Sequence, residues 1–365
     1  MKRIVHIVAE AVRGGCESNC AVFIRHAPGF RHSVVVLGIP GPMSAVWTDL
    51  GSEVRHLDLL ALGWTRFGAG LRTALQKMEA DGVISWAGVR VPLQAHGLRP
   101  FGAPVLFYAG NPLAGSMRVR LLLAMSRLVF PPPPRATVIA CSSHVARSYA
   151  RAPYYRGLPI VTLLNPVESP DHNVHCPRPL DVDAVVRIGM VARLDPIKDH
   201  ALLLRAFRVL RQTWTRAELH LAGDGVLRLD LEDLARELGI ADAVSFHGSL
   251  SDVPGFLDSL DLFCYLTTDR EGMGSAFAEA LARGLPCVAN ELAVLREVAG
   301  AADDSAAIFV PADPESVAAA VDRLLRDPAG RQRLSARAWG RARQTFAPTR
   351  IVEGYLAAME LGPAP

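Results

Sequence analysis

The chain has 365 residues, of which 50% are hydrophobic and 21% are charged, and its formal net charge is +3. This length exceeds what one hydrophobic core usually supports and predicts two domains of roughly 150–200 residues each. The composition excludes a disordered or fibrous chain. The absence of any run of about 18 apolar residues argues against a membrane-spanning helix.

The beginning of the chain and the cysteines bear on the cellular compartment. The opening residues, MKRIVHIVAEAVRGG, lose their apolar run at Glu10 and predict a first strand rather than a signal peptide. The six cysteines are scattered, and Cys16 and Cys20 have no matching Cys/His pair that would complete a zinc site. We therefore expect a cytoplasmic protein in a reducing environment, without a bound metal.

Short β-branched runs alternate with amphipathic stretches along the chain. We expect a first series of buried strands at 3–9, 32–38, 82–88, 104–110, 137–143 and 159–165. We expect a second series at 185–193, 217–225, 243–249, 261–267 and 285–291. Helical periodicity fills the gaps, for example at 200–214 and 230–240. This alternation predicts parallel sheets covered by helices on both faces.

The two series predict an α/β protein with two doubly wound domains. The stretch 165–184 is rich in Pro, Asp and His, lacks periodicity, and is expected to contain the seam. We place an N-terminal domain at 1–170, a C-terminal domain at 171–345 and a final helix within 346–365. Ligands of such sheets bind at the carboxyl ends of the strands, so two facing domains would form a cleft.

Charge is distributed unevenly between the two parts. Residues 1–180 contain 19 Lys and Arg against 9 Asp and Glu, whereas the remainder contains 20 against 27. The first part therefore suits an anionic partner. The alternative is that a basic and an acidic domain attract each other across a shared cleft.

The stretch DREGMGSAFAEALARG, residues 269–284, combines two carboxylates with a glycine-rich turn. Glu271 is expected in the loop after a strand, followed by the turn GMGS and by a helix that Gly284 ends. Backbone N–H groups and the helix dipole at such an N-terminus favour phosphate. Glu271 and Glu279, with seven residues between them, fit a ligand with sugar, diphosphate and ribose in series. The alternative is a turn cap at Glu271 and an exposed helix residue at Glu279.

Two cations follow the strand expected at 185–193. Arg193 ends that strand, and Lys198 lies at the start of the next helix. If both point into the cleft, they neutralise a diphosphate, the arginine as a fork and the lysine as a point charge. Taken alone, Lys198 is an ordinary surface lysine.

Gly14 and Gly15 form a turn after the first strand and allow close approach of backbone and ligand from the other wall of the cleft. The pattern is not G-x-G-x-x-G, so a dinucleotide cofactor is not supported.

In this order and spacing, IGMVARLDPIKDH, LHLAGDGV, DREGMGSAFAEALARGLPCVA and LREV resemble glycosyltransferase family 4, the retaining nucleotide-sugar enzymes of the GT-B fold. The resemblance covers most of the C-terminal half. It is looser in the N-terminal half, where it rests on the Gly14–Gly15 turn, VIACSSHVARSYA and LLNPVE. It implies two Rossmann-like domains facing a central cleft, the first for the acceptor and the second for the nucleotide sugar, with the last helix near the seam.

By this resemblance, catalysis rests on Glu271, Arg193 and Lys198. Glu271 would bind hydroxyls of the donor hexose, and the two cations would hold the diphosphate that leaves with negative charge. Fixed cations stabilise that charge without a metal, and no Asp-x-Asp motif is placed to hold one. Two carboxylates that straddle a nucleotide sugar also disfavour hydrolysis, which needs them to flank one glycosidic bond.

The resemblance also implies a set of donor-binding residues. Glu279 would bind the ribose diol, and Ser275 would add a backbone contact to phosphate. The full set is Gly15, Gly272, Met273, Gly274, Ser275 and Glu279. We expect Glu271→Ala to reduce turnover with little loss of stability, because the residue is predicted in a ligand loop rather than in a core.

One departure from the family concerns the N-terminal domain. Many members carry a histidine near the reacting sugar, after the strand that corresponds to 104–110, where this chain has Gly110 and Asn111. His96 and His144 do not match by spacing and are expected to be surface or cap residues. Either the site works without that group, or Asn111 substitutes for it on the acceptor side beside Gly14, or activity is reduced.

These features predict a metal-independent hexosyltransferase that uses a nucleotide-diphosphate sugar, with UDP favoured, and a glycan or lipid-linked acceptor of bacterial cell-surface polysaccharide or glycoconjugate synthesis. A soluble small-molecule acceptor, a nucleotide-sugar epimerase and a non-catalytic binder are the alternatives. The basic and apolar stretch 116–130 is a candidate for peripheral membrane contact, with core burial of its leucines as the alternative. Nothing in the sequence indicates nucleic-acid binding.

Overall fold

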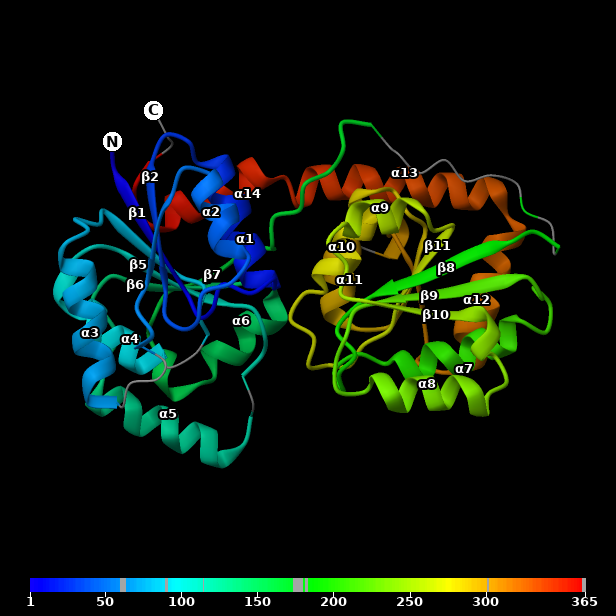
Figure 1. Cartoon of the computed structure of the whole chain (residues 1–365), viewed down its shortest axis with the longest axis horizontal. Helices are drawn as coiled ribbons and strands as arrows, with labels where there is room; N and C mark the ends of the chain where they lie inside the picture. Colours follow the sequence, from blue (N-terminus) through cyan, green and yellow to red (C-terminus); the bar gives the residue numbers. More distant parts are fainter. Residues whose placement is uncertain are drawn as a thin grey trace. The chain divides into compact units, whose positions relative to one another are not determined.

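The computed structural model describes residues 1–59, 64–88, 91–113, 115–172, 180, 183–300 and 302–362. The chain divides into two compact units, an N-terminal unit of residues 1–166 with 348–365 and a C-terminal unit of residues 167–347 (Figure 1). The boundaries predicted from the sequence are 170/171 and 345/346. The predicted seam, 165–184, lies in part outside the described residues.

The N-terminal unit contains a parallel seven-stranded sheet in the order β3-β2-β1-β4-β5-β6-β7. Its strands are β1 Arg3–Val8, β2 Arg31–Val36, β3 Glu53–His56, β4 Gly82–Ser85, β5 Val105–Ala109, β6 Ala136–Ala140 and β7 Ile160–Thr162. Its helices are α1 Gly15–His26, α2 Met43–Asp49, α3 Trp64–Gln76, α4 Val91–Leu98, α5 Met117–Val129, α6 Ser143–Ala150 and α14 Pro348–Ala358, with short 3-10 turns η2 Arg99–Phe101 and η3 Pro153–Tyr155.

The C-terminal unit contains a parallel six-stranded sheet in the order β10-β9-β8-β11-β12-β13. Its strands are β8 Val186–Val191, β9 Ala217–Ala222, β10 Val244–Gly248, β11 Leu262–Tyr265, β12 Cys287–Asn290 and β13 Ile308–Val310. Its helices are α7 His200–Leu210, α8 Arg228–Glu237, α9 Val253–Asp258, α10 Ser275–Ala282, α11 Ala293–Ala299, α12 Pro314–Arg326 and α13 Pro328–Thr345, with 3-10 turns η4 Ala241–Ala243 and η5 Ala302–Asp304.

The strands predicted from apolar runs are present in both sheets, and two further strands lie at sheet edges. β3 has the sequence EVRH, whose residues are all partly or fully exposed, so no apolar run marks it. β13 has only three residues, which is too short for a period to be recognised. Both are edge strands, which need less apolar surface than strands covered on two faces.

In both units the first strand lies inside the sheet, and the strand order reverses next to it. The reversal falls between β1 and β4 in the N-terminal unit and between β8 and β11 in the C-terminal unit. Ligands of open parallel sheets bind outside the carboxyl ends of the strands at such reversals. The loops after β1, β8 and β11 carry most of the predicted site residues, so the topology places them where a ligand is expected.

Helix α14 returns the end of the chain to the N-terminal unit, where it packs on α1 (Figure 1). The Tyr355 ring lies 5.7 Å from that of Phe23 and 5.4 Å from that of Trp86. A side chain at Gly354 would lie 2.8 Å from Leu163, so glycine permits the close approach of the helix. α14 therefore completes the core of the first unit.

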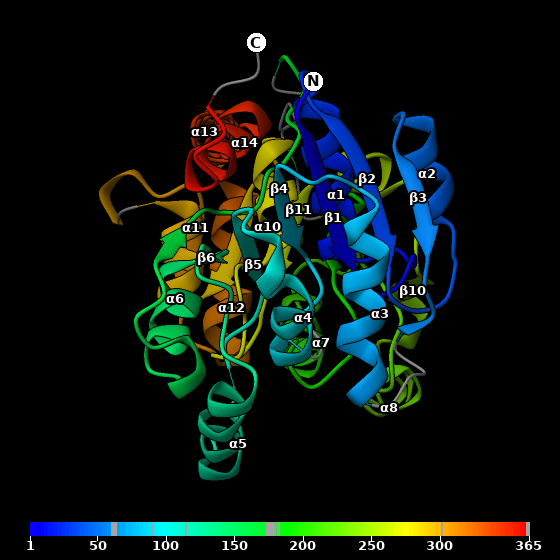
Figure 2. The same cartoon turned by 90° about the vertical axis from the view of Figure 1, so that its left-hand side faces the viewer.

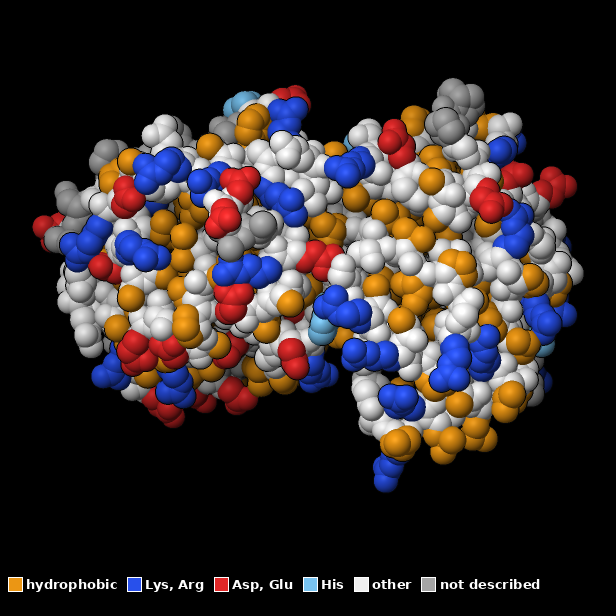
Figure 3. Space-filling model, turned by 180° about the vertical axis from the view of Figure 1, so that it is seen from behind, with side chains coloured by type: hydrophobic (Ala, Val, Ile, Leu, Met, Phe, Trp, Pro, Cys, Tyr) orange, Lys and Arg blue, Asp and Glu red, His pale blue; other side chains and the backbone are white. Residues whose placement is uncertain are grey.

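Helix α5 lies at the periphery of the N-terminal unit in both views of the fold (Figures 1 and 2). None of its residues is buried, so the predicted alternative of core burial for its leucines is wrong. Lys and Arg side chains alternate with hydrophobic ones over the lower part of this unit, on the face that Figure 3 shows at the right. Among the described residues, no helix is both long and apolar enough to cross a membrane.

Candidate functional site

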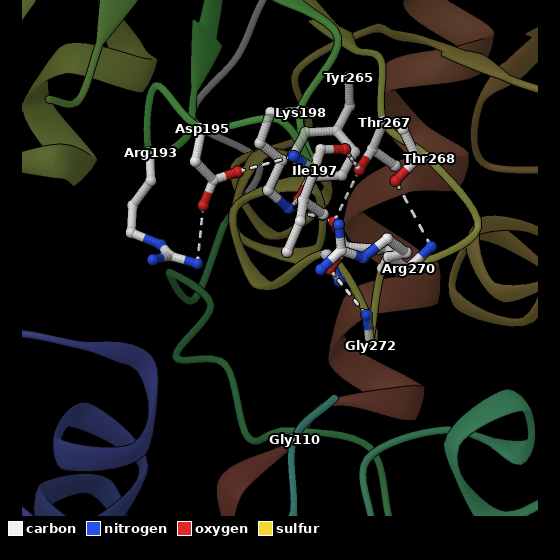
Figure 4. A network of polar contacts seen from close by, with 12 residues as sticks. Gly110, Arg193, Asp195, Ile197, Lys198, Tyr265, Thr267, Thr268, Arg270 and Gly272 are labelled. Carbon is white, nitrogen blue, oxygen red and sulfur yellow. Dashed lines mark hydrogen bonds and ion pairs between the residues drawn. The ribbon is translucent and has the colours of Figure 1, made fainter. Parts of the chain in front are cut away.

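The loop after β8 carries Arg193, Asp195 and Lys198 (Figure 4). Asp195 shapes this loop, because its Oδ1 accepts the amide of Ile197 at 3.0 Å and its carbonyl accepts the amide of Lys198 at 3.0 Å. The other carboxylate oxygen forms an ion pair with Arg193 at 2.8 Å. The Arg193 side chain is 74% exposed, so a turn fixed by Asp195 presents a cation to solvent.

Lys198 turns from the same loop toward β11 and is only 12% exposed. Its Nζ donates to the hydroxyl of Tyr265 at 2.6 Å and forms an ion pair with Oε2 of Glu271. The ammonium also lies 5.0 Å from the centre of the Tyr265 ring. Lys198 is therefore not an ordinary surface lysine, and the structure brings it to Glu271 as the sequence predicts for one ligand site.

The carboxylate of Glu271 receives hydrogen bonds on both oxygens. Oε1 accepts the amides of Gly272 and Gly274, each at 3.0 Å. Oε2 accepts from Lys198 and from the Tyr265 hydroxyl at 2.9 Å. The Thr267 hydroxyl lies 3.2 Å from Oε2 and 2.9 Å from the carbonyl of Ile197, so its single proton serves one of the two at a time.

This environment sets the ionisation of Glu271. Burial raises the pKa of the carboxyl, but the charge of Lys198 and the hydrogen bonds from Lys198, Tyr265 and Thr267 outweigh that effect and hold the pKa below its usual value. The residue is thus ionised and only 6% exposed. Glu271 lies in a loop as predicted, but that loop is folded back on β11 and Lys198, so its side chain is buried instead of open to a ligand.

A carboxylate offers about four lone-pair positions, so Glu271 is saturated in this structure. Gly272 and Gly274 belong to the predicted donor-binding set, but their amides donate to Glu271 itself. Met273, from the same predicted set, is 2% exposed. A sugar would therefore have to replace one of the present donors before it could bind Glu271.

The turn before α10 requires glycine at one position. Gly274 has φ of +81°, and a side chain there would lie 2.9 Å from the Tyr265 ring. The helix begins at Ser275 and is followed at Gly284 by a left-handed residue with φ of +71°, which confirms the predicted helix end. The dipole of α10 thus points its positive end at the same loop as Glu271.

Glu279 lies further along α10 and is half-buried. Among the described residues, its carboxylate has no hydrogen-bond or ion-pair partner. Burial raises its pKa to about 7. The alternative that Glu279 is an exposed helix residue is wrong, and a half-buried carboxyl without a partner can accept hydroxyls of a ligand.

The turn after β1 in the N-terminal unit is open at Gly15. A side chain at Gly15 would meet no atom within 4 Å, whereas one at Gly14 would lie 2.6 Å from Glu17. Burial and the nearby Glu10 raise the pKa of Glu17, against a lowering by its own backbone hydrogen bond. The turn therefore combines free space at one glycine with a carboxyl in the first turn of α1.

The loop after β5 contains Gly110 and the exposed Asn111. A side chain at Gly110 would lie 2.9 Å from the ring of Tyr108, whose hydroxyl donates to Asn165 at 2.7 Å. Glycine is thus required sterically where many members of the resembled family carry their histidine. His144, near the start of α6, has a buried Nε2 without a hydrogen-bond partner among the described residues.

Sequence reasoning missed four residues that hold the C-terminal site together. Asp195 is marked by an Asp-Pro turn signal after a strand. Tyr265 and Thr267 belong to an apolar run and carried no signal of a polar role. Asn290 accepts a hydrogen bond from the amide of Thr267 at 3.0 Å and donates one to the Thr267 carbonyl at 2.9 Å, and so fixes the segment that follows β11. No cluster of three or more His, Cys, Asp or Glu that could hold a metal occurs among the described residues.

The C-terminal unit matches a known family. The model of the family described as glycosyl transferases group 1 matches residues 183–341. A lipopolysaccharide core biosynthesis glycosyltransferase, LpsD of Rhizobium meliloti, is 35% identical over 183 residues, which cover 50% of this chain and 51% of LpsD. The chain thus spans about half the length of this relative.

Solved structures match both units at low sequence identity. Anabaena HepE, solved in complex with UDP and glucose, has a TM-score of 0.79 and 17% identity, with 99% of this chain and 100% of that chain covered. WaaG, a glycosyltransferase involved in lipopolysaccharide biosynthesis, has a TM-score of 0.72 and 16% identity, with 96% and 98% covered. The whole chain therefore has the GT-B fold, and its residues 183–341 are related to the group 1 glycosyl transferases.

Proposed function

We propose that this protein is a retaining, metal-independent glycosyltransferase of family 4. It moves a hexose from a UDP-sugar to a glycan or lipid-linked acceptor in bacterial cell-surface glycoconjugate synthesis. The observation that carries the proposal is the buried Lys198–Glu271 pair at the strand-order reversal of the C-terminal sheet, inside the segment that matches the group 1 family. The names of LpsD and WaaG support the pathway, and the UDP and glucose of HepE support the donor.

Donor binding exchanges the partners of this pair. Hydroxyls of the hexose replace the Lys198 ammonium as donors to Glu271, and the freed ammonium turns to the diphosphate. Lys198 is the donor that can leave, because its stem is flexible, whereas Tyr265 and Thr267 are held by β11 and Asn290. Recognition of the sugar thereby releases the cation that the leaving group needs.

The other predicted residues complete the grip on the donor. Arg193, held on Asp195, supplies a second cation for the diphosphate. The N-terminus of α10 at Ser275 adds its positive dipole end. Glu279 accepts the ribose hydroxyls. Gly15, the remaining residue of the predicted donor-binding set, lies in a turn with free space around its α-carbon.

Transfer then requires stabilisation of the leaving nucleotide. The bond from the anomeric carbon to the phosphate oxygen breaks, the acceptor oxygen bonds to the same face of that carbon, and the acceptor proton leaves with the UDP. Charge develops on the diphosphate, so Lys198 and Arg193 lower the barrier through fixed electrostatics. In this proposal, Asn111 and Gly14 contact the acceptor.

The test is incubation with a panel of UDP-, GDP- and TDP-hexoses, with nucleotide release and sugar fate measured separately by mass spectrometry. Slow release of UDP, accelerated by a glycolipid extract and insensitive to EDTA, is expected. Lys198→Met should lower the rate of release by at least about 10²-fold. Lys77→Met, at the exposed lysine that follows α3, should leave the rate unchanged.

The other outcomes contradict the proposal in different ways. An isomerised donor indicates an epimerase, and binding without turnover indicates a sugar-nucleotide binder. Transfer only to soluble acceptors overturns the glycan or lipid-linked assignment alone. An inverted anomeric centre in the product, read by NMR, overturns retention alone.

A further inference from the structure

Helix α5 turns its apolar side away from the rest of the N-terminal unit. Six large hydrophobic side chains of this helix are between 55% and 85% exposed: Met117, Leu121, Leu122, Met125, Leu128 and Val129. At 3.6 residues per turn, these six fall within an arc of about 140°. An ordinary surface helix directs such an arc at the core, and α5 does the opposite.

The opposite side of α5 holds the helix on the N-terminal unit. Arg127, on that side, donates to the carbonyl of Tyr154 in η3, and the Tyr154 hydroxyl donates to the carbonyl of Phe130 at 3.0 Å. Ser116 caps the first turn by accepting the amide of Val119. The helix is therefore fixed with its apolar arc outward, rather than loosely attached.

The part of the sequence that contains α5 has basic residues and no acidic ones. Residues 82–167 contain nine arginines and no Asp, Glu or Lys. Arg118 lies within the apolar arc and is exposed. Arg120 is also exposed but lies outside the arc, about 60° beyond the edge that Met117 marks. The lower part of this unit in Figure 3, where hydrophobic and basic side chains alternate, shows no acidic side chain on the visible face.

This combination selects the partner. A second copy of the chain would bring like charges together, because α5 and the segments next to it carry arginines only. An anionic bilayer surface supplies both requirements, since acyl chains receive the apolar arc and lipid phosphates receive the arginines. Arginine stems can lie along the apolar layer while their heads reach the headgroups.

We propose that α5 docks this protein on anionic phospholipid membranes, with its axis in the membrane plane and its outward arc inserted at the headgroup boundary. This inference goes beyond the transfer reaction and does not depend on it. Docking through α5 would hold the N-terminal unit at the membrane surface, where a lipid-linked acceptor is also located.

The experiment is sedimentation of the full chain with phosphatidylcholine vesicles, with and without phosphatidylglycerol. Binding is expected only with phosphatidylglycerol, and it should weaken with added salt. The double variant Leu121→Glu with Met125→Glu should lower the partition coefficient by about tenfold or more. Arg118→Glu should lower it by about fivefold or more, since each basic residue near an anionic surface contributes about that factor.

The matched control is Leu229→Glu, at a similarly exposed leucine of α8 in the other unit, and it should bind vesicles as the wild type does. Thermal unfolding of each variant should be unchanged, because the altered side chains are exposed. The proposal is overturned if the wild type ignores anionic vesicles, if Leu229→Glu loses binding as the double variant does, or if the double variant abolishes a dimer while vesicle binding stays. UDP titration of the same variants keeps donor binding separate, since α5 should not affect it.

Discussion

The two units carry the same kind of element, a glycine-rich turn that leads from a strand at the order reversal into a helix, but they use it differently. In the C-terminal unit, Gly274 is locked by its positive φ and by the Tyr265 ring, and the turn wraps an ion-paired carboxylate. In the N-terminal unit, Gly15 faces open space. One turn is therefore a preformed electrostatic device and the other an opening for a ligand, although both appear in the sequence as paired small residues before a helix.

We expect the largest effect from substitutions that remove one charge of the Lys198–Glu271 ion pair in the C-terminal unit. Lys198→Met or Glu271→Gln alone should lower the rate of UDP release by at least about 10²-fold. Each should also lower the free energy of unfolding by about 3 kcal/mol, because it leaves one buried charge without its partner. The double variant should recover much of the stability and none of the activity. Chemical denaturation and a release assay check this, and two stable single variants beside an unstable double variant would contradict it.

Alanine substitutions at Gly274 and Gly15 test whether the two turns differ in how tightly they are packed. Gly274→Ala forces a β-carbon into a left-handed residue against Tyr265 and should cost about 2 kcal/mol of stability or more. Gly15→Ala should change stability by less than about 0.5 kcal/mol but weaken UDP-sugar binding, because its methyl group occupies the open side of the turn. Denaturation midpoints and calorimetric titration separate the two effects. Equal destabilisation by both substitutions would show that the turns are built alike.

A substitution at Tyr265 tests whether its hydroxyl lowers the pKa of Glu271 or whether the residue contributes only to packing. Tyr265→Phe keeps the ring but removes the hydroxyl that donates to Glu271, so the pKa of Glu271 should rise and the acid limb of kcat/KM should move to higher pH. We expect a loss of about tenfold at neutral pH. Tyr355→Phe is the control, because the Tyr355 hydroxyl is buried without a partner among the described residues, and its removal should be neutral or stabilising. An unchanged pH profile for Tyr265→Phe would assign the hydroxyl to packing alone.

The raised pKa of Glu279 should make protein stability and UDP binding change in opposite directions with pH: stability falls and binding tightens as the pH rises. Its pKa is raised from 4.5 in the unfolded chain to about 7 in the folded one, so the folded state holds the extra proton between these values, and stability falls as pH rises through 7. Glu279→Gln should remove this slope and raise stability by about 1–3 kcal/mol at about pH 8. UDP binding by the wild type should tighten over the same rise as the carboxylate ionises, and the variant should lose that trend. Unfolding and titration across pH measure both, and a wild-type stability that rises through neutral pH would refute the assignment.

The smallest effect concerns the N-terminal unit's histidines. His144→Ala removes an imidazole with an unsatisfied buried nitrogen in the first turn of α6. We expect a fewfold loss of transfer with unchanged UDP binding. His96→Ala serves as the control, because the His96 ring packs edge-on against Phe130 and should affect stability only. Equal activity of both variants would leave the acceptor side without a histidine, as the sequence indicates.

The sequence predicted the features that depend on neighbouring residues, and it did not predict those that depend on contacts between residues distant in the chain. Apolar runs predicted the inner strands. The positions of Lys198 and Glu271 after two such strands, together with the family resemblance, predicted a shared site, because the carboxyl ends of parallel strands lie at one sheet edge. The saturation of Glu271 could not be predicted, since Tyr265 and Thr267 look like any other residues of a buried strand. For α5 the sequence left surface exposure and core burial both open, because periodicity shows that a helix has an apolar side but not where that side points.

The return of α14 has a consequence for how the protein is made. Tyr355 closes the aromatic cluster of Phe23 and Trp86, yet it is synthesised after the whole C-terminal unit. During translation, all residues of the second unit are therefore synthesised before Tyr355 can cover Phe23 and Trp86 in the first unit. The order of synthesis and the order of completion are reversed, and a chaperone that shields apolar surface would meet the beginning of this chain rather than its middle.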